Sequence, residues 1–160
     1  MINQFRTIDD LKEEIKELEK ILMRPTLRLS HPTLYRKRDV SEGEVIIKGV
    51  RVKDWCLSED FKWVLPHDQM GLSFSATFSN LKSVYKFKQK HNPGRAIHIH
   101  WVLEKADIPD GLKFVQDRRP GKKAHWFLTV TDKILLSQLV QKLKMVANRM
   151  SIIRDGGKAL

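Results

Sequence analysis

The sequence contains a single cysteine and no hydrophobic run long enough to cross a bilayer. Cys56 on its own excludes an internal disulfide and fits a reducing compartment, or a chain delivered directly into one. The beginning of the chain is acidic and amphipathic, unlike a signal peptide. We therefore expect no membrane partner and a cytoplasmic place of action, in either the producing or a recipient cell. With 160 residues, 41% of them hydrophobic, the chain is long enough for one globular core.

Metal-binding signatures are also missing. The sequence has no CxxC or HExxH motif, which are the spacings typical of zinc sites. His98 and His100 lie on one face of a predicted strand, with Ile97, Ile99 and Trp101 on the other. No third ligand follows at a diagnostic spacing, so we predict no metal site.

The sequence does carry a large excess of positive charge. Thirty lysines and arginines against nineteen acids give a net charge of +11. Such a surplus attracts polyanions, which include nucleic acids, a nucleotide cofactor and an acidic protein partner. The basic residues are spread along the chain in pairs, which indicates a charged surface more than a disordered basic arm. A basic surface without a dedicated ligand is the competing interpretation.

The clearest local pattern runs from Gly71 to Leu81. Alternation of apolar and hydroxyl side chains predicts a strand, and the apolar spacing that follows predicts a helix capped by Thr77 or Ser79. The helix should end before the sequence Asn92-Pro93-Gly94. Three hydroxyls share one strand face and lead into the first turn of the helix: Ser73, Ser75 and Thr77. Hydroxyls and free amides there favour an anionic ligand, although such a row is also typical of a solvated edge strand.

Two elements are predicted before this turn. Apolar spacing from Ile8 to Leu22 predicts an N-terminal amphipathic helix that ends before Pro25, so residues 1–24 are separated here from a domain of residues 25–160. Residues 32–38 are predicted to form a first strand with Leu34 inward. Arg36 shares the face of Leu34, where burial of its charge calls for an anionic partner such as a pyrophosphate. An exposed arginine at a strand end is the alternative.

The remaining elements complete an α+β pattern. We expect a hairpin or kinked strand at residues 44–53, an aromatic patch at 55–65, and strands at 95–103, 112–115 and 124–130. A basic loop at 117–123 precedes the last of these strands. A broad apolar stripe from Leu135 to Met150 predicts a final helix.

Several separated segments together resemble one family. They are Thr33-Leu34-Tyr35-Arg36, the Gly71-Leu72-Ser73 turn, Asp107-Ile108-Pro109 with Leu112-Lys113 and Gln116-Asp117, and His125-Trp126 before the long final helix. In this order, over residues 32 to 150, the chain resembles the ADP-ribosyltransferase-like toxins delivered by type VI secretion. The resemblance implies an α+β fold with a split β-sheet around an NAD cleft, flanking helices and, here, an extra N-terminal helix.

The resemblance also implies roles for individual residues. Arg36 would clamp the pyrophosphate, Ser73 and Ser75 would orient the nicotinamide ribose, and His125 would bond a ribose hydroxyl. The implied cofactor-binding residues are Tyr35, Arg36, Ser73, Ser75, Thr77, Tyr85 and His125. The implied catalytic residues are Arg36, Ser73, His125 and Glu104.

The chain departs from ordinary ADP-ribosyltransferases in its acidic residues. Those enzymes place a glutamate against the ribose 2′-hydroxyl, but the second half of this chain has no Glu-x-Glu or Gln-x-Glu motif, and Glu104 and Asp117 are the nearby acids. Two functions are therefore expected as alternatives. The first is NAD-dependent ADP-ribosyl transfer, or NAD hydrolysis, directed at a macromolecule. The second is non-enzymatic binding of nucleic acid through residues 86–90 and 118–123, with a tryptophan as a stacking partner.

Overall fold

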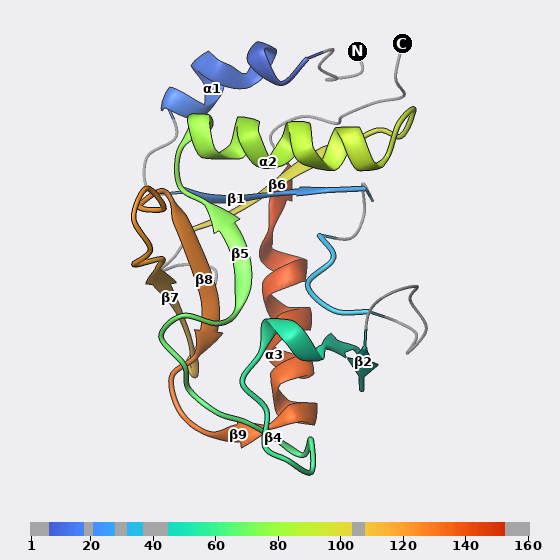
Figure 1. The fold of residues 1–160 in the computed structure, drawn as a ribbon, viewed down its shortest axis with the longest axis vertical. Helices are drawn as coiled ribbons and strands as arrows, with labels where there is room; N and C mark the ends of the chain where they lie inside the picture. Colours follow the sequence, from blue (N-terminus) through green and yellow to red (C-terminus); the bar gives the residue numbers. More distant parts are fainter. Residues whose placement is uncertain (1–6, 18–20, 28–31, 37–44, 104–107, 153–160) are drawn as a thin grey trace.

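A computed structural model of the chain describes residues 7–17, 21–27, 32–36, 45–103 and 108–152 (Figure 1). Its main feature is an antiparallel sheet with the strand order β10-β6-β1-β5-β8-β7. The strands are β1 (Ile21–Thr26), β5 (Leu72–Ser75), β6 (His98–Leu103), β7 (Leu112–Gln116), β8 (His125–Val130) and β10 (Ser151–Ile152). Together with its helices, this sheet confirms the predicted α+β class.

The sheet consists of two halves that meet at one residue pair. β1 pairs with β6 along the whole of Ile21–Thr26, whereas β1 and β5 are paired at Met23 and Ser75 alone. Figure 1 shows the consequence, because β1 runs across the direction of β5 and β8. The strands β10, β6 and β1 therefore form one half, and β5, β8 and β7 form the other. We call the region where β1 and β5 diverge the split.

Two long helices cover the sheet. Helix α2 (Phe78–His91) packs on the β1 half, and helix α3 (Leu136–Arg149) packs on the β5 half and on the other face of the β1 half. Side chains alternate across a strand, so neighbouring residues of β1 enter different cores. The α2 core contains Ile8, Leu11, Ile15, Ile21, Met23, Leu81, Tyr85, Ile97 and Ile99. The α3 core is larger and includes Leu22, Leu72, Phe74, Phe114, Leu128, Leu139 and Leu143.

The predicted N-terminal helix is wrong in its second half. The chain forms a 3₁₀ turn (η1, Ile8–Leu11) and the short helix α1 (Lys12–Glu17), but Ile21–Thr26 is strand β1. An apolar run fits a helix or a buried strand equally well, and pairing with β6 decides for the strand. The boundary drawn between residues 24 and 25 consequently falls inside β1. Pro25 is tolerated there because β1 has already diverged from β5.

The predicted first strand at residues 32–38 is also wrong over residues 32–36, the part of it that the structure describes. Residues 32–36 form a bend, and Thr33 has a φ of 57°, which interrupts an extended backbone. Leu34 is nevertheless buried as predicted. The amide of Arg36 donates to the carbonyl of Gly49 at 2.6 Å, which joins the bend to the next hairpin.

That hairpin confirms the prediction for residues 44–53. Strands β2 (Ile46–Ile47) and β3 (Val50–Arg51) are antiparallel and joined by Lys48 and Gly49, both with positive φ, as in a two-residue hairpin turn. The 3₁₀ turn η2 (Val52–Asp54) follows. Trp55 is buried in the α3 core, as expected of the aromatic patch, but Phe61 is exposed. Trp63 belongs to β4 (Trp63–Val64), which pairs with β9 (Ile134–Leu135).

Candidate functional site

The turn from β5 into α2 holds the predicted hydroxyls. Thr77 is the N-cap of α2, and its Oγ1 accepts a hydrogen bond from the amide of Asn80 at 3.2 Å. Ser75 is 2% exposed, and its Oγ donates to Oδ1 of Asn80 at 2.6 Å. Ser73 is exposed. The prediction therefore located the turn and its cap, but it missed Asn80, which ties the hydroxyls to the first turn of the helix.

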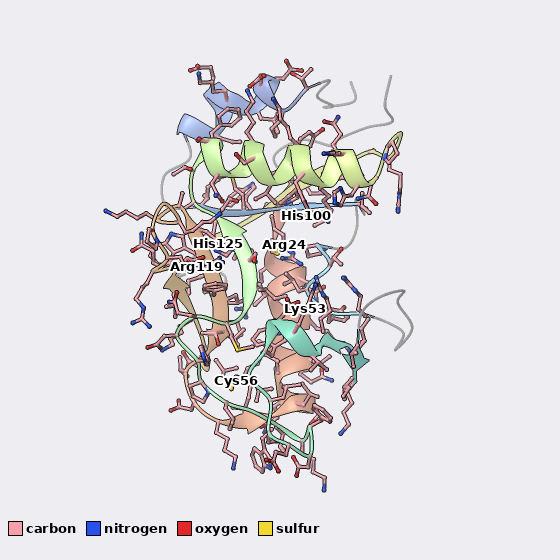
Figure 2. The ribbon with its side chains drawn as sticks, in the orientation of Figure 1. Arg24, Lys53, Cys56, His100, Arg119 and His125 are labelled. Carbon is pink, nitrogen blue, oxygen red and sulfur yellow. The ribbon has the colours of Figure 1, made fainter. Side chains whose placement is uncertain are left out.

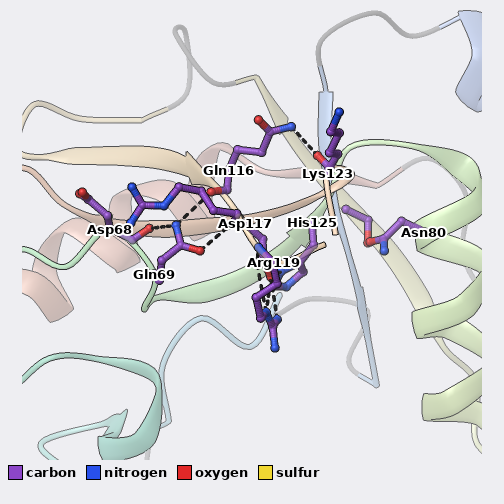
Figure 3. A network of polar contacts seen from close by, with 10 residues as sticks. Asp68, Gln69, Asn80, Gln116, Asp117, Arg119, Lys123 and His125 are labelled. Atoms are coloured by element: carbon purple, nitrogen blue, oxygen red, sulfur yellow. Dashed lines mark hydrogen bonds and ion pairs between the residues drawn. The ribbon is translucent and has the colours of Figure 1, made fainter. Parts of the chain in front are cut away.

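His125 lies beside this turn. It is the cross-strand partner of Ser75, and its side chain is 13% exposed. Its Nδ1 is 2.8 Å from Oδ2 of Asp117, whose carboxylate is fully buried. Figure 3 shows that carboxylate between the side chains of His125 and Arg119. We call Asp117, Arg119 and His125 the histidine cluster.

Arg119 holds the carboxylate from the other side. Its Nη2 donates to Oδ2 at 2.6 Å, its Nε lies 3.1 Å from both oxygens, and its backbone amide donates to Oδ1 at 2.9 Å. The hydrogen bonds from Arg119, with that from His125, lower the pKa of Asp117 well below its usual range, although burial opposes them. Asp117 is therefore a carboxylate at neutral pH. The sequence suggested a loose basic loop here, and nothing in its pattern predicted that Arg119 folds back onto Asp117.

Arg24 occupies the split on the other side of β5. Its guanidinium donates to three carbonyls, those of Pro32 at 3.2 Å, Thr33 at 3.0 Å and Ser73 at 3.0 Å. It thereby connects β1, the bend at residues 32–36 and β5. Figure 2 shows Arg24 and His125 on the two sides of the end of β5. Arg24 was not among the predicted site residues, because residues up to 24 were expected to form a helix.

A small pocket adjoins Arg24. It has a volume of about 10 Å³, which is room for about one water molecule. Its walls come from β1, the bend, the β2–β3 hairpin and β5: Arg24, Thr33, Leu34, Tyr35, Arg36, Gly49, Arg51, Asp54 and Leu72. Among these residues three arginines accompany one acid, Asp54, which lies 3.5 Å from Nε of Arg51. We call this the arginine pocket.

The crowding of positive charge is reflected in the pKa values. Burial lowers the pKa of Arg24 to about 10; Asp54 opposes this shift, and Arg36 and Arg51 add to it. Burial lowers the pKa of Lys88 on α2 to about 8, and repulsion from Arg24, Arg36 and Arg51 adds to it. An anion in the arginine pocket would relieve this repulsion.

The predicted site residues are thus divided over two places. Tyr35 and Arg36 line the arginine pocket, where Lys144 also lies 5.8 Å from the ring centroid of Tyr35. Ser75, Thr77 and His125 gather at the start of α2. Leu72 faces the pocket, so the side chain of Ser73 points to the opposite face of β5. Ser73 contacts Arg24 through its carbonyl.

Two predicted residues belong to neither place as described. Tyr85 is 5% exposed inside the α2 core, and burial raises its pKa. Glu104 lies outside the described residues.

Comparisons with models of protein families, with curated proteins and with solved structures found no match to this chain. In the part of the chain that the structure describes, no three potential ligands gather as they would around a metal ion. Within the same residues, no helix has both the length and the apolar character needed to span a membrane.

Proposed function

We propose that the protein binds NAD at the split and cleaves its bond between nicotinamide and ribose, passing ADP-ribose to a macromolecule or to water. The observation that carries this proposal is the charge of the arginine pocket, where three guanidinium groups lie at the place where the two halves of the sheet diverge. The pocket has room for about one water molecule, so the phosphates would lie over it and not inside it. Arginine pairs with pyrophosphate oxygens in a bidentate way, so Arg36 and Arg51 suit the two phosphates of a dinucleotide. Arg24 is committed to three carbonyls and shapes the pocket.

The second place supplies groups for a ribose. Leu72, which lines the pocket, and Ser75, which neighbours His125, are the two ends of β5, about 10 Å apart along an extended strand. Their side chains lie on opposite faces of β5, so a dinucleotide that contacts both places would pass around the end of this strand. The resemblance to type VI ADP-ribosyltransferase-like toxins and the division of the sheet into two crossing halves agree with this assignment. NAD is then a cytoplasmic substrate, in the producing or a recipient cell.

Loss of Arg36 should slow the reaction. We expect Arg36→Ala to lower nicotinamide release from NAD by about tenfold, since a charged hydrogen bond to phosphate contributes about 1.5 kcal/mol or more. The assay incubates the protein with adenylate-labelled NAD and cell extract, and follows nicotinamide, free ADP-ribose and labelled macromolecules. Arg118→Ala is the matched control, because Arg118 is exposed and the charge change is identical. Release that is absent in the wild type, or equal in both variants, refutes the proposal.

Affinity should also depend on pH through Lys88. Its lowered pKa of about 8 means that it loses its proton as the pH rises from 7 to 9, whereas the arginines stay charged. We expect ADP-ribose, whose pyrophosphate does not titrate in this range, to bind about fivefold more weakly at pH 9, since one nearby charge contributes about 1 kcal/mol. Calorimetry at both pH values measures this. The Lys88→Met variant should bind ADP-ribose weakly and with equal affinity at pH 7 and pH 9. A pH dependence in that variant as large as in the wild type would contradict the assignment.

Nucleic-acid binding is retained as a second candidate because of one exposed aromatic residue. Phe87 on α2 is 63% exposed, although its ring centroid lies 4.2 Å from that of His91. Lys86 and Lys90 on the same helix are exposed, so this face combines an aromatic ring for base stacking with positive charge. Trp63, Trp101 and Trp126 are each half-buried and therefore less available than Phe87. Binding through this face would involve several phosphate contacts, each of which releases counterions. The affinity for nucleic acid should therefore fall steeply between 50 and 200 mM salt. An acidic antitoxin or immunity protein would recognise the same charge excess.

A further inference from the structure

The geometry of the histidine cluster determines which nitrogen of His125 carries a proton. An ionised carboxylate only accepts hydrogen bonds, so Nδ1 at 2.8 Å from Asp117 must be the protonated nitrogen. Arg119 keeps Asp117 ionised through its three side-chain contacts and one amide contact. In the neutral form of the imidazole, Nε2 is therefore the nitrogen without a proton. This is the arrangement in which a buried carboxylate orients a histidine as a base.

The other nitrogen has no hydrogen-bond partner among the described residues, although the ring is largely buried. Phe127 packs against it edge to face, with ring centroids 4.8 Å apart, which fixes the plane of the imidazole. Ser75 is the nearest candidate for a serine nucleophile, but its hydroxyl already donates to Asn80 at 2.6 Å. The cluster thus lacks the serine-to-histidine hydrogen bond of a hydrolase triad. A base that is oriented and has no nucleophile of its own requires one from a substrate.

We propose that His125 is the general base for the acceptor of ADP-ribose, and that Asp117 is the residue that positions it; this inference rests on the proposed function. In the step, the bond between C1′ of the ribose and the nicotinamide nitrogen breaks, and its electron pair leaves with neutral nicotinamide. An oxygen of the acceptor forms the new bond to C1′. The proton of that oxygen passes to Nε2 of His125. Atoms and charge balance without any further reactant.

This assignment narrows the class of acceptor. A terminal phosphate is already ionised at neutral pH and gains nothing from a base, whereas a hydroxyl or a water molecule must lose a proton as it attacks. The structure therefore favours a hydroxyl-bearing acceptor, or water, over the phosphate end of a nucleic acid. Asn80 stands beside the same position, and its side-chain NH₂ has no partner among the described residues, so it is available to donate to that acceptor or to the ribose.

The first test needs no substrate. In ¹⁵N-labelled wild-type protein, the chemical shifts of His125 should show the tautomer protonated at Nδ1. In Asp117→Asn the preference for that tautomer should be lost. A carboxylate can only accept a hydrogen bond from Nδ1, whereas an amide can also donate one to it. A wild-type ring protonated at Nε2 would overturn the positioning role of Asp117, whether or not NAD is consumed.

The second test measures turnover of NAD. Asp117→Asn should lower kcat at least tenfold and change KM less than about threefold, because the base acts in the chemical step and not in binding. Asp68→Asn, at an exposed carboxylate 3.9 Å from Lys113, is the matched control. Should Asp117→Asn fold poorly, His125→Ala with added imidazole takes its place, and imidazole should restore part of kcat.

The outcomes separate the two proposals. No release of nicotinamide by the wild type defeats the proposed function. Release that is equal in Asp117→Asn and Asp68→Asn, or His125→Ala that is as active as the wild type, defeats only the role of the histidine cluster. Label that transfers to a 5′-phosphate with undiminished rate in Asp117→Asn would overturn the acceptor class.

Discussion

Arg24→Ala is expected to lower the free energy of unfolding by about 2–4 kcal/mol. The substitution removes the donors to the carbonyls of Pro32, Thr33 and Ser73, and a hydrogen bond from a charged group contributes about 1.5–3 kcal/mol before other terms offset it. It also removes the guanidinium 5.9 Å from the ring centroid of Phe74. Relief of repulsion with Arg36 and Arg51 offsets part of the loss, which is why the expected total is smaller than the sum.

Urea unfolding followed by tryptophan fluorescence measures this change. Arg24→Lys keeps the charge, but one ammonium group cannot reach all three carbonyls. The free energy of unfolding of this variant should therefore lie about midway between those of the wild type and Arg24→Ala. Arg118→Ala, at an exposed arginine with no side-chain contact among the described residues, should stay within about 0.5 kcal/mol of the wild type. Equal midpoints for Arg24→Ala and Arg118→Ala would mean that Arg24 does not hold the split together.

Arg24 is an example of a residue whose position could not be predicted from the sequence. The turn at residues 71–91 was predictable because its signals are local: alternation along β5, a threonine at the N-cap, and Asn92-Pro93-Gly94 after the helix. Ile21, Leu22 and Met23 carry no such signal, because consecutive apolar residues fit both a helix and a strand. Only the partner β6 decides between them. Arg24 was therefore placed on the wrong element, and its contacts with residues eight to forty-nine positions away could not be foreseen.

The candidate-site residues also differ in whether local sequence signals or tertiary contacts determine their positions. Tyr35 and Arg36, predicted to bind NAD, line the arginine pocket, although the bend that presents them is not the predicted strand. His125 and Ser75 are neighbours because their strands pair, and the predicted strands were correct. The ion pair of the buried Asp117 with the exposed Arg119 depends on how two side chains two positions apart fold back onto each other, which no sequence periodicity records. Charge, by contrast, could be read from composition, since the arginine pocket reflects the overall excess of basic residues.

Gly71→Ala should destabilise the fold by about 3 kcal/mol or more. Gly71 has a φ of +152°, a conformation that residues with a side chain rarely adopt. A Cβ atom placed there would lie 2.2 Å from the carbonyl oxygen of Leu128 and 3.3 Å from Cβ of Phe127. Both belong to β8, the strand that pairs with β5. The clash can be relieved only by moving one backbone strand away from another, which costs cross-strand hydrogen bonds as well as packing.

Gly94→Ala separates the clash from the backbone strain. Gly94 also has a positive φ, +77°, but a Cβ atom there meets nothing within 4 Å, so alanine should cost about 1 kcal/mol. The difference between the two variants in urea unfolding measures the contact of Gly71 with β8. Because β5 carries the Ser73 carbonyl at one site and Ser75 at the other, a displaced β5 should also reduce NAD turnover in Gly71→Ala below that of Gly94→Ala under conditions where both are folded. Equal stability of the two variants would show that β5 does not lie against β8 as described.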